Sequence, residues 1–287
     1  MHKFIKLRKY FSSFQTIVVH LQRKYGKTSI MSMKKIFFLP VALTILASCA
    51  SSYNVEGTSS VSALDGNKLY LKAIKNNEFK NIDSCDVVHG EFHFTGLLDT
   101  VRMATLFMDD ESIMPVVLEK GEITITIDPI RQVVGGTPMN DSLYKFIDRH
   151  NQLTSQMNEL SHKQSQMMLE GIDEEVINRQ LSMEARKIAQ EEDRLVMKFI
   201  EENFDNVLGP GVFMMITSQY RYPILTPQIE DIMSKATKRF KEDPYVKDYY
   251  QTAQENEKRM NGLGEQPQDV AAPAPSSPNP LTNIPQK

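Results

Sequence analysis

The two cysteines, Cys49 and Cys85, have the widest chemical scope in this chain, because a thiol can be acylated, oxidised or bound to a metal ion. Cys49 comes directly after the small residues Ala47 and Ser48, at the end of an apolar run that begins at Ile36. Two lysines precede the run, so basic, apolar and small residues follow one another as in a cleaved secretory signal. The run of eleven residues is too short to span a bilayer, which takes about 20 apolar residues. We therefore predict cleavage just before Cys49.

The segment Leu46-Ala47-Ser48-Cys49 resembles the lipobox of bacterial lipoproteins, in which the cysteine is acylated and becomes the new N-terminus. Burial of an acyl chain is worth about 0.8 kcal/mol per CH2, so a cysteine with several chains is held firmly in a bilayer. The resemblance implies lipidation at Cys49 and a place in the bacterial cell envelope. An ordinary cleaved signal with an incidental cysteine is the alternative. No acidic residue follows directly, which favours an outer membrane lipoprotein that faces the periplasm.

Residues 1–48 are therefore predicted to be a leader that is removed. Within it, residues 1–32 are either a misassigned start, with Met31 or Met33 as the true one, or a long basic leader. The leader holds nine of the 33 basic residues and none of the 36 acidic ones, which leaves 24 against 36, a net charge of about −12, for the mature chain. Because such a protein repels phosphate groups, we expect no nucleic-acid partner.

Residues 53–138, which follow a short tether at 49–52, show the pattern of an antiparallel β domain. Short alternating or β-branched runs are separated by turn pairs such as Asp65-Gly66. About eight strands joined as a meander predict a sandwich or a barrel. A two-residue turn at Lys120-Gly121 would place Leu118 opposite Ile123. The runs lie at Val55, Leu69-Tyr70-Leu71, Glu91-Phe92-His93-Phe94, Val101 to Met108, Val116-Val117-Leu118 and Ile123 to Ile127.

A second two-residue turn, at His89-Gly90, would place Cys85 opposite Phe94 on the inner face of the sheet. The thiol is then predicted to be buried, and burial in apolar surroundings raises a cysteine pKa. With Cys49 acylated, Cys85 has no partner for a disulfide. A redox-active or nucleophilic Cys85 is the alternative interpretation.

The only apparent metal-binding pattern is His89-x-Glu91-x-His93, whose period of two would put three side chains on one face of a strand. The turn at His89 disrupts this alignment. We expect His93 to lie opposite Asp86 as a solvated charge pair, and we predict no metal site.

Residues 139–261 change to a helical period and are predicted to form a helical domain. The first helix starts after Asn140 as its N-cap and runs to about Leu169. After a turn at Glu170-Gly171, a second helix ends near Phe204, which gives a long antiparallel hairpin. Its apolar stripe is expected to pack within the chain; a partner-binding face with adaptable methionines is the alternative. These methionines are Met157, Met167, Met168 and Met183.

Two further helices are predicted where a capping side chain precedes proline, at Thr226-Pro227 and Asp243-Pro244. The second carries a tyrosine cluster, which we expect to pack against the hairpin, with glycan or partner binding as the alternative. Residues 262–287 hold six of the fourteen prolines and no apolar period, so we predict a disordered tail. The predicted fold class is α+β, with the β domain followed by the helical hairpin and these two helices.

Residues 53–146 resemble a β domain of bacterial envelope lipoproteins known as domain of unknown function 4369. In that family the β domain and a helical segment commonly precede a thioredoxin-like domain of the thiol-disulfide oxidoreductase or peroxiredoxin-like type. Here residues 264–269 fall where that domain would begin, and a proline-rich tail follows instead. The resemblance therefore implies no catalytic residue. It rests on Val55-Glu56-Gly57, Lys68 to Leu71, Ile82-Asp83-Ser84, Gly90 to Gly96, Leu118 to Ile125 and Gly136-Thr137-Pro138-Met139-Asn140-Asp141.

The chain contains no phosphate-binding glycine loop, no GxSxG elbow and no recognisable carboxylate pair, so we predict neither catalytic residues nor a cofactor. Two functional hypotheses follow. The first is a non-enzymatic, lipid-anchored envelope protein with a binding or scaffold role toward an envelope protein partner. The second is an accessory of a periplasmic thiol-disulfide redox system.

Overall fold

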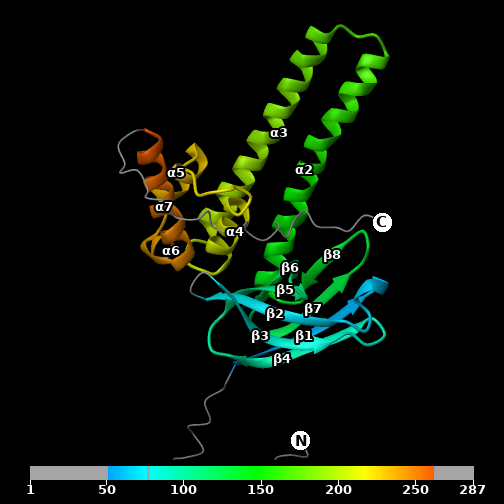
Figure 1. The fold of residues 1–287 in the computed structure, drawn as a ribbon, viewed down its shortest axis with the longest axis vertical. Helices are drawn as coiled ribbons and strands as arrows, with labels where there is room; N and C mark the ends of the chain where they lie inside the picture. The colour runs from blue at the N-terminus through cyan, green and yellow to red at the C-terminus, as the bar shows by residue number, and fades with distance from the viewer. Residues whose placement is uncertain (1–50, 76–77, 262–287) are drawn as a thin grey trace, which may run out of the picture. The chain divides into compact units, whose positions relative to one another are not determined.

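The computed structural model describes residues 51–75 and 78–261, which form two four-stranded sheets followed by helices (Figure 1). The α+β class and the eight strands are confirmed, and the two sheets face each other as a sandwich with no closed barrel. The strands are β1 (Ser51–Ser59), β2 (Lys68–Lys75), β3 (Glu78–Asp86), β4 (Glu91–Leu98), β5 (Arg102–Met108), β6 (Glu111–Leu118), β7 (Gly121–Ile127) and β8 (Gln132–Gly135). A short 3-10 helix, Ser62–Leu64, lies between β1 and β2.

The sheet order departs from the meander that the sequence predicted. One sheet has the order β4-β1-β7-β8 and the other β3-β2-β5-β6, and β1 runs parallel to β7. The expected pairing of Leu118 with Ile123 is wrong, because the chain crosses between the sheets at this turn. Leu118 pairs with Arg102, and Ile123 pairs with Val55. Both apolar side chains still enter the core, now from opposite sheets.

The turn at His89-Gly90 forms as predicted. Both residues have positive φ angles, 54° and 77°, as a type I′ turn requires. The backbones of Val88 and Glu91 exchange two hydrogen bonds of 2.9 and 3.0 Å across it. The hairpin extends no further, because β3 pairs with β2 and β4 pairs with β1. Ser51 and Ser52, expected in a tether, belong to β1.

Six helices follow the sandwich up to residue 261, where the described chain ends, and the predicted hairpin is the longest feature among them. At 1.5 Å per residue, its first helix of 32 residues spans about 48 Å. Thr226 and Asp243 cap two later helices as predicted, but two additional helices were missed, one of which contains the apolar stretch Val212–Ile216. The helices are α2 (Pro138–Leu169), α3 (Glu174–Glu202), α4 (Leu208–Thr217), α5 (Pro227–Lys235), α6 (Lys238–Glu242) and α7 (Pro244–Met260).

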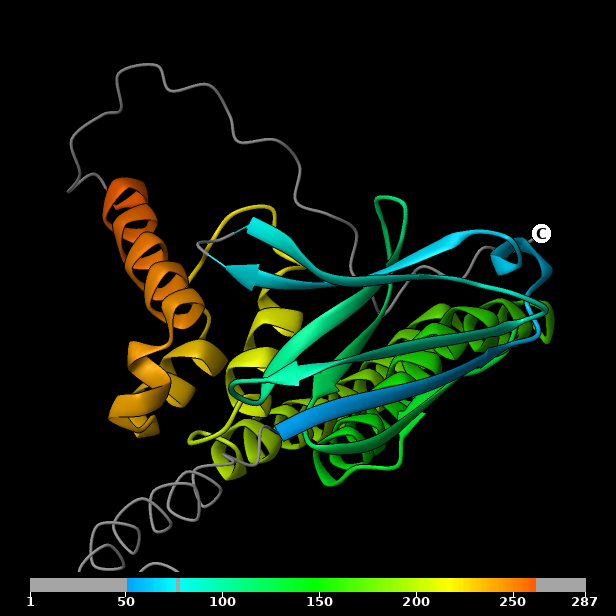
Figure 2. The same cartoon turned by 90° about the horizontal axis from the view of Figure 1, so that it is seen from below.

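The sandwich and the base of the helical region share one hydrophobic core. Side chains from both sheets meet residues of all helices after β8 in a single buried cluster. α4 lies close to the sheet that contains β5, where a side chain at Gly211 would come within 2.9 Å of the side chain of Met103 (Figure 2). Within residues 51–75 and 78–261, no helix is both long and apolar enough to cross a membrane.

Candidate functional site

Cys85 lies on β3, where it pairs with Leu69 of β2 rather than with Phe94 as predicted. Its side chain is half-buried, less enclosed than we expected. Burial raises the pKa of the thiol to about 11, although a hydrogen bond with the backbone of His93 partly opposes this effect. At pH 7 roughly one thiol in ten thousand would then be ionised. The site does not activate Cys85 as a nucleophile.

The residues of the His-x-Glu-x-His pattern do not come together. His89 lies in the turn, and the imidazole of His93 faces Glu56 of β1 with 3.1 Å between Nδ1 and Oε1. The predicted neighbour, Asp86, instead forms an ion pair with Lys68 at 3.1 Å. The prediction failed because β4 pairs with β1 and not with β3. In the described part of the chain, no group of three or more His, Cys, Asp or Glu residues could hold a metal ion.

Asn140 has a different role from the predicted N-cap. The helix begins at Pro138 after Thr137, and Asn140 is fully buried in its first turn. Its Oδ1 accepts a hydrogen bond from the Val117 N–H at 2.9 Å, and its Nδ2 donates to the Val117 carbonyl at 2.8 Å. Nδ2 also donates to Thr137 Oγ1 at 2.8 Å. Because Val117 lies on the edge strand β6, the side-chain amide takes the place of a neighbouring strand.

Two further polar contacts secure the same junction. The carboxylate of Glu119 is buried and accepts hydrogen bonds from the backbone N–H groups of Met139, at 2.8 Å, and Asn140, at 3.2 Å. These N–H groups have no partner within the helix, and a negative charge is favourable at this end. Tyr144 donates to the Pro115 carbonyl at 2.9 Å, and burial raises the pKa of its hydroxyl well above the ordinary value. We call this junction, which comprises Thr137 and α2 up to Leu153, the hairpin root.

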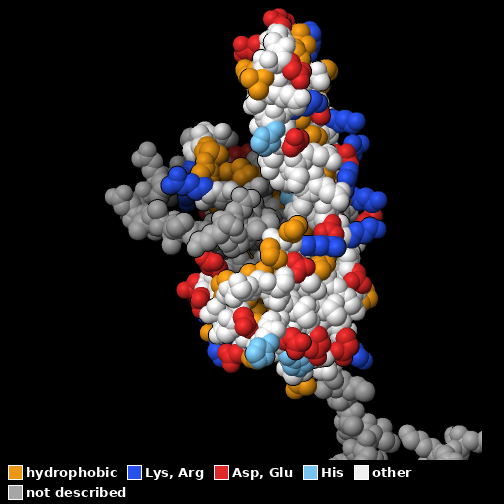
Figure 3. Space-filling view, turned by 90° about the vertical axis from the view of Figure 1, so that its right-hand side faces the viewer, with side chains coloured by type: hydrophobic (Ala, Val, Ile, Leu, Met, Phe, Trp, Pro, Cys, Tyr) orange, Lys and Arg blue, Asp and Glu red, His pale blue; other side chains and the backbone are white. Residues whose placement is uncertain are grey.

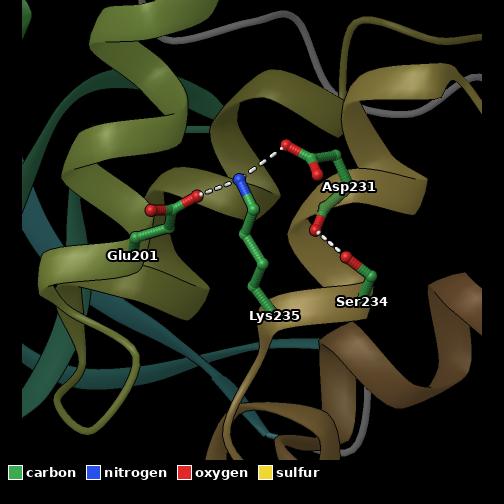
Figure 4. A network of polar contacts seen from close by, with 4 residues as sticks. All are labelled: Glu201, Asp231, Ser234 and Lys235. Atoms are coloured by element: carbon green, nitrogen blue, oxygen red, sulfur yellow. Dashed lines mark hydrogen bonds and ion pairs between the residues drawn. The ribbon is translucent and has the colours of Figure 1, made fainter.

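Charged side chains connect α5 to α3 (Figure 4). Lys235 Nζ lies 2.9 Å from Glu201 of α3 and 2.8 Å from Asp231 of α5, and Ser234 Oγ donates to the Asp231 carbonyl at 2.7 Å. Hydrogen bonds to the carboxylates of Asp231 and Glu201 raise the pKa of Lys235. Exposed ion pairs of this kind contribute little to stability. The buried side chains of Ile229 and Ile232 therefore hold α5 in place, and the network adds only a surface contact to α3.

The tyrosines of α7 are used for packing. Tyr249 Oη donates to the Ile224 carbonyl at 3.1 Å and accepts from the Ile224 N–H at 3.2 Å. Tyr245 Oη lies 3.0 Å from Thr217 Oγ1, and its ring stacks on Tyr249 with the centroids 6.2 Å apart. Burial raises the pKa of Tyr249 to about 12. These contacts favour packing over a glycan site, but the partners lie on α4 and the α4–α5 connection and not on the hairpin as predicted.

Shallow hollows on the described surface include one beside α6 and one between the helices of the hairpin. The larger, of about 550 Å³, lies beside α6, where Lys238 pairs with Glu242 at 3.6 Å, so its charges are partly balanced. The smaller, of about 290 Å³, lies between the two helices of the hairpin and is bordered by the Lys163–Glu184 pair. Neither combines a nucleophile with an activating base.

The end of the hairpin presents apolar side chains to solvent. We call Met168, Leu169 and Val176 the hairpin tip; Leu169 is 90% exposed and the other two are also exposed. Figure 3 shows hydrophobic side chains among acidic ones at this end of the hairpin. Of the other methionines singled out above, Met183 is exposed, Met157 is half-buried and Met167 is buried. The tip is the candidate interaction surface, because flexible apolar side chains can adapt to a partner.

These observations define an α+β protein whose sandwich supports a long helical hairpin. Residues 53–143 match the model of a family described as Domain of unknown function (DUF4369), so this part of the chain contains a domain of that family. The match covers the sandwich and the start of the root. The described residues that follow it are all helix, turn or loop and contain no thioredoxin-like sheet. No curated protein and no solved structure matches the chain.

The motif residues behind the family resemblance acquire a structural explanation. Glu119, Thr137, Asn140 and Asp141 all act at the root, where Asp141 also accepts a hydrogen bond from the Gly136 N–H at 3.1 Å. No local sequence pattern indicates the Asn140–Val117 contact, because the two residues are 23 positions apart. The predicted lipidation residue, Cys49, lies outside the described residues.

Proposed function

We propose that this protein is a non-enzymatic, lipid-anchored protein of the bacterial cell envelope, with a binding or scaffold role toward an envelope protein partner. It is an outer membrane lipoprotein that faces the periplasm. The observation that carries this proposal is Leu46-Ala47-Ser48-Cys49 behind a short apolar run. The acidic mature chain supports lipid attachment, because its charge does not favour anionic lipid surfaces.

The hairpin is the surface through which a partner binds. Its distal part adds little to the common core, since only Met167 and Ile177 are buried among residues 154–187. Ordering such an arm has an entropic cost, and few internal contacts offset it. The tip nevertheless leaves apolar side chains in water, as is typical of surfaces that a partner covers.

The redox-accessory hypothesis finds weak support. It needs either an accessible, reactive Cys85 or a docking site for a separate thioredoxin-like enzyme. The half-buried thiol with a raised pKa argues against the first form.

Fractionation of bacterial cells tests the anchor. The wild-type chain should appear in the outer membrane fraction and incorporate a labelled fatty acid, whereas Cys49→Ala should lose both properties. Cys85→Ala is the matched control and should behave as wild type. A soluble wild-type protein, or a Cys49→Ala variant that fractionates as wild type, would reject the anchor.

The same cells test the binding role. A photo-crosslinking amino acid at Leu169, on the tip, should give one discrete crosslinked envelope protein. The control position is Ile130, which is 93% exposed on the β7–β8 connection of the sandwich. Equal crosslinking from both positions, or none from Leu169, would contradict a partner at the tip.

A further inference from the structure

The fold begins almost at the predicted anchor. β1 starts at Ser51, two residues after Cys49, and two residues of extended chain reach at most about 7 Å. If Cys49 carries acyl chains, a condition that rests on the proposed function, the start of β1 is held against the lipid surface. The sandwich then has a defined end near the bilayer, which we call the anchor end.

Strand pairing identifies what else lies at the anchor end. Ser51 pairs with Leu98 and Ser52 pairs with Leu97, so the end of β4 lies beside the start of β1. Leu97 is 77% exposed on this edge strand. The β4–β5 and β6–β7 connections also lie at this end, together with the end of β2 and the start of β3, because the strands alternate in direction.

The two ends of the sandwich differ in net charge. Counting terminal strand residues and the connections between strands, the anchor end has three basic and three acidic residues, a balance of zero. The opposite end has two basic and seven acidic residues, a balance of −5. The first set is Lys75, Arg102 and Lys120 with Glu78, Asp99 and Glu119; the second is Lys68 and Arg131 with Asp65, Asp86, Glu91, Asp109, Asp110, Glu111 and Asp128.

The hairpin points away from the anchor end. Along α2, Asn140 contacts Val117 near the anchor end, and Asp148 reaches Arg131 at the opposite end with 3.4 Å between the charged groups. The 21 residues from 149 to 169 continue the same helix for about 30 Å. Figure 1 shows the start of β1 and the α2–α3 turn at opposite ends of the view.

We propose that the anchor end of the sandwich rests on the lipid bilayer, with Leu97 inserted at its interface and the hairpin tip held away from it. The two-residue link, the exposed leucine and the charge balance support the same orientation. Anionic lipid repels the acidic opposite end, whereas the neutral anchor end lies against lipid without this repulsion. An apolar side chain held at the surface enters the boundary between headgroups and acyl chains.

Tryptophan fluorescence tests this orientation directly, because the chain contains no tryptophan. The lipidated full-length protein, with Leu97→Trp, is reconstituted into vesicles of phosphatidylcholine brominated on its acyl chains. Bromine quenches tryptophan on contact, so fluorescence should fall about twofold relative to unbrominated vesicles. Leu169→Trp at the tip and Ile130→Trp at the opposite end are the controls and should show no quenching. Circular dichroism matching wild type confirms that each variant is folded.

The possible failures can be distinguished. Wild-type protein that does not float with vesicles contradicts the lipid anchor itself. Protein that floats but leaves a tryptophan at position 97 unquenched overturns the orientation and leaves the anchor intact. Quenching at position 169 would show that the hairpin lies on the bilayer and would also overturn it. A concentration-dependent spectral shift of Leu97→Trp in a chain that also carries Cys49→Ala would identify a second copy as the occupant and overturn it too.

Discussion

The hairpin root and the distal hairpin share helix α2 but are stabilised in different ways. In the root, residues 137–153, seven side chains are buried. In the distal hairpin, residues 154–187, two are buried, Met167 and Ile177, and neither joins the cluster that links the sandwich to the helices. The root is therefore part of the folding core, whereas the distal hairpin is held by sparse contacts.

The root stabilises the fold, whereas the distal hairpin extends from it and contributes little to its stability. Segments with few buried apolar contacts open locally at lower free energy than the core that supports them. The distal hairpin can therefore adjust its surface to a partner without unfolding the sandwich. The polar contacts at the root keep its direction fixed, because Asn140 and Tyr144 bind the backbone of the edge strand.

The largest effect is expected at Asn140. Replacing it with alanine leaves the buried N–H and carbonyl of Val117 without these partners, and each unsatisfied group costs about 1–3 kcal/mol. We expect Asn140→Ala to reduce the free energy of unfolding of the whole protein by about 3 kcal/mol, measured by urea denaturation. Asn158→Ala, on the exposed face of the same helix, should change it by less than about 0.5 kcal/mol. If Asn140→Ala and Asn158→Ala reduced the free energy of unfolding equally, the buried contacts of the root would not stabilise the fold more than the exposed face of the helix does.

A smaller and local effect is expected at Ile177 in the distal hairpin. Ile177→Ala should lower the local opening free energy of residues 160–185 by about 2 kcal/mol, because it removes one of two buried side chains there. Hydrogen exchange measured by mass spectrometry should speed up in this segment and stay unchanged in the sandwich. Ile147→Ala, a matched change at the root, should instead accelerate exchange throughout. Global acceleration by Ile177→Ala would contradict the division into two regions.

The sequence could predict those parts of the fold that depend on interactions between residues close together in the chain. The caps at Thr226 and Asp243 act on the next turn of the chain, and both helices were placed correctly. Thr137-Pro138 has the same residue types in sequence, but Thr137 makes no side-chain cap, and Asn140, which the sequence predicts as the cap, lies inside the first turn. The side chain of Asn140 is satisfied by Val117, which is distant in sequence, so no local pattern could reveal its role.

Sheet assignment failed for the same reason. The turn at Lys120-Gly121 has a local hairpin signature, yet β7 pairs with β1, about 70 residues earlier, because that arrangement buries the apolar faces of two sheets against each other. The alternation along each strand predicted inward residues such as Ile123 correctly, since alternation does not depend on the partner strand. The predicted pairing of His93 with Asp86 is wrong for the same reason, because the actual neighbour Glu56 lies on β1, which is distant in sequence.

The smallest expected effect concerns Glu192 of α3, where the distal hairpin meets the root. His150 Nε2 lies 3.0 Å from Glu192 Oε1, and this hydrogen bond lowers the pKa of Glu192 below its ordinary value of 4.5. The unfolded chain therefore takes up the proton at a higher pH than the folded one, so the contact stabilises the fold above pH 4.5 and is lost as the pH falls through the lowered pKa. Because the side chain is 36% exposed, solvent screening limits the effect to about 0.5 kcal/mol.

Glu192→Gln should be less stable than wild type at pH 7, and the difference should shrink below pH 4.5, as measured by thermal unfolding across this range. Glu159→Gln, an exposed change in the distal hairpin, provides a baseline that varies little with pH. Exchange protection should fall first in the segments that pack around His150, because the contact joins α2 to α3 at this level. A difference between Glu192→Gln and wild type that persists unchanged at low pH would mean that packing, and not the charge of Glu192, holds the two helices together there.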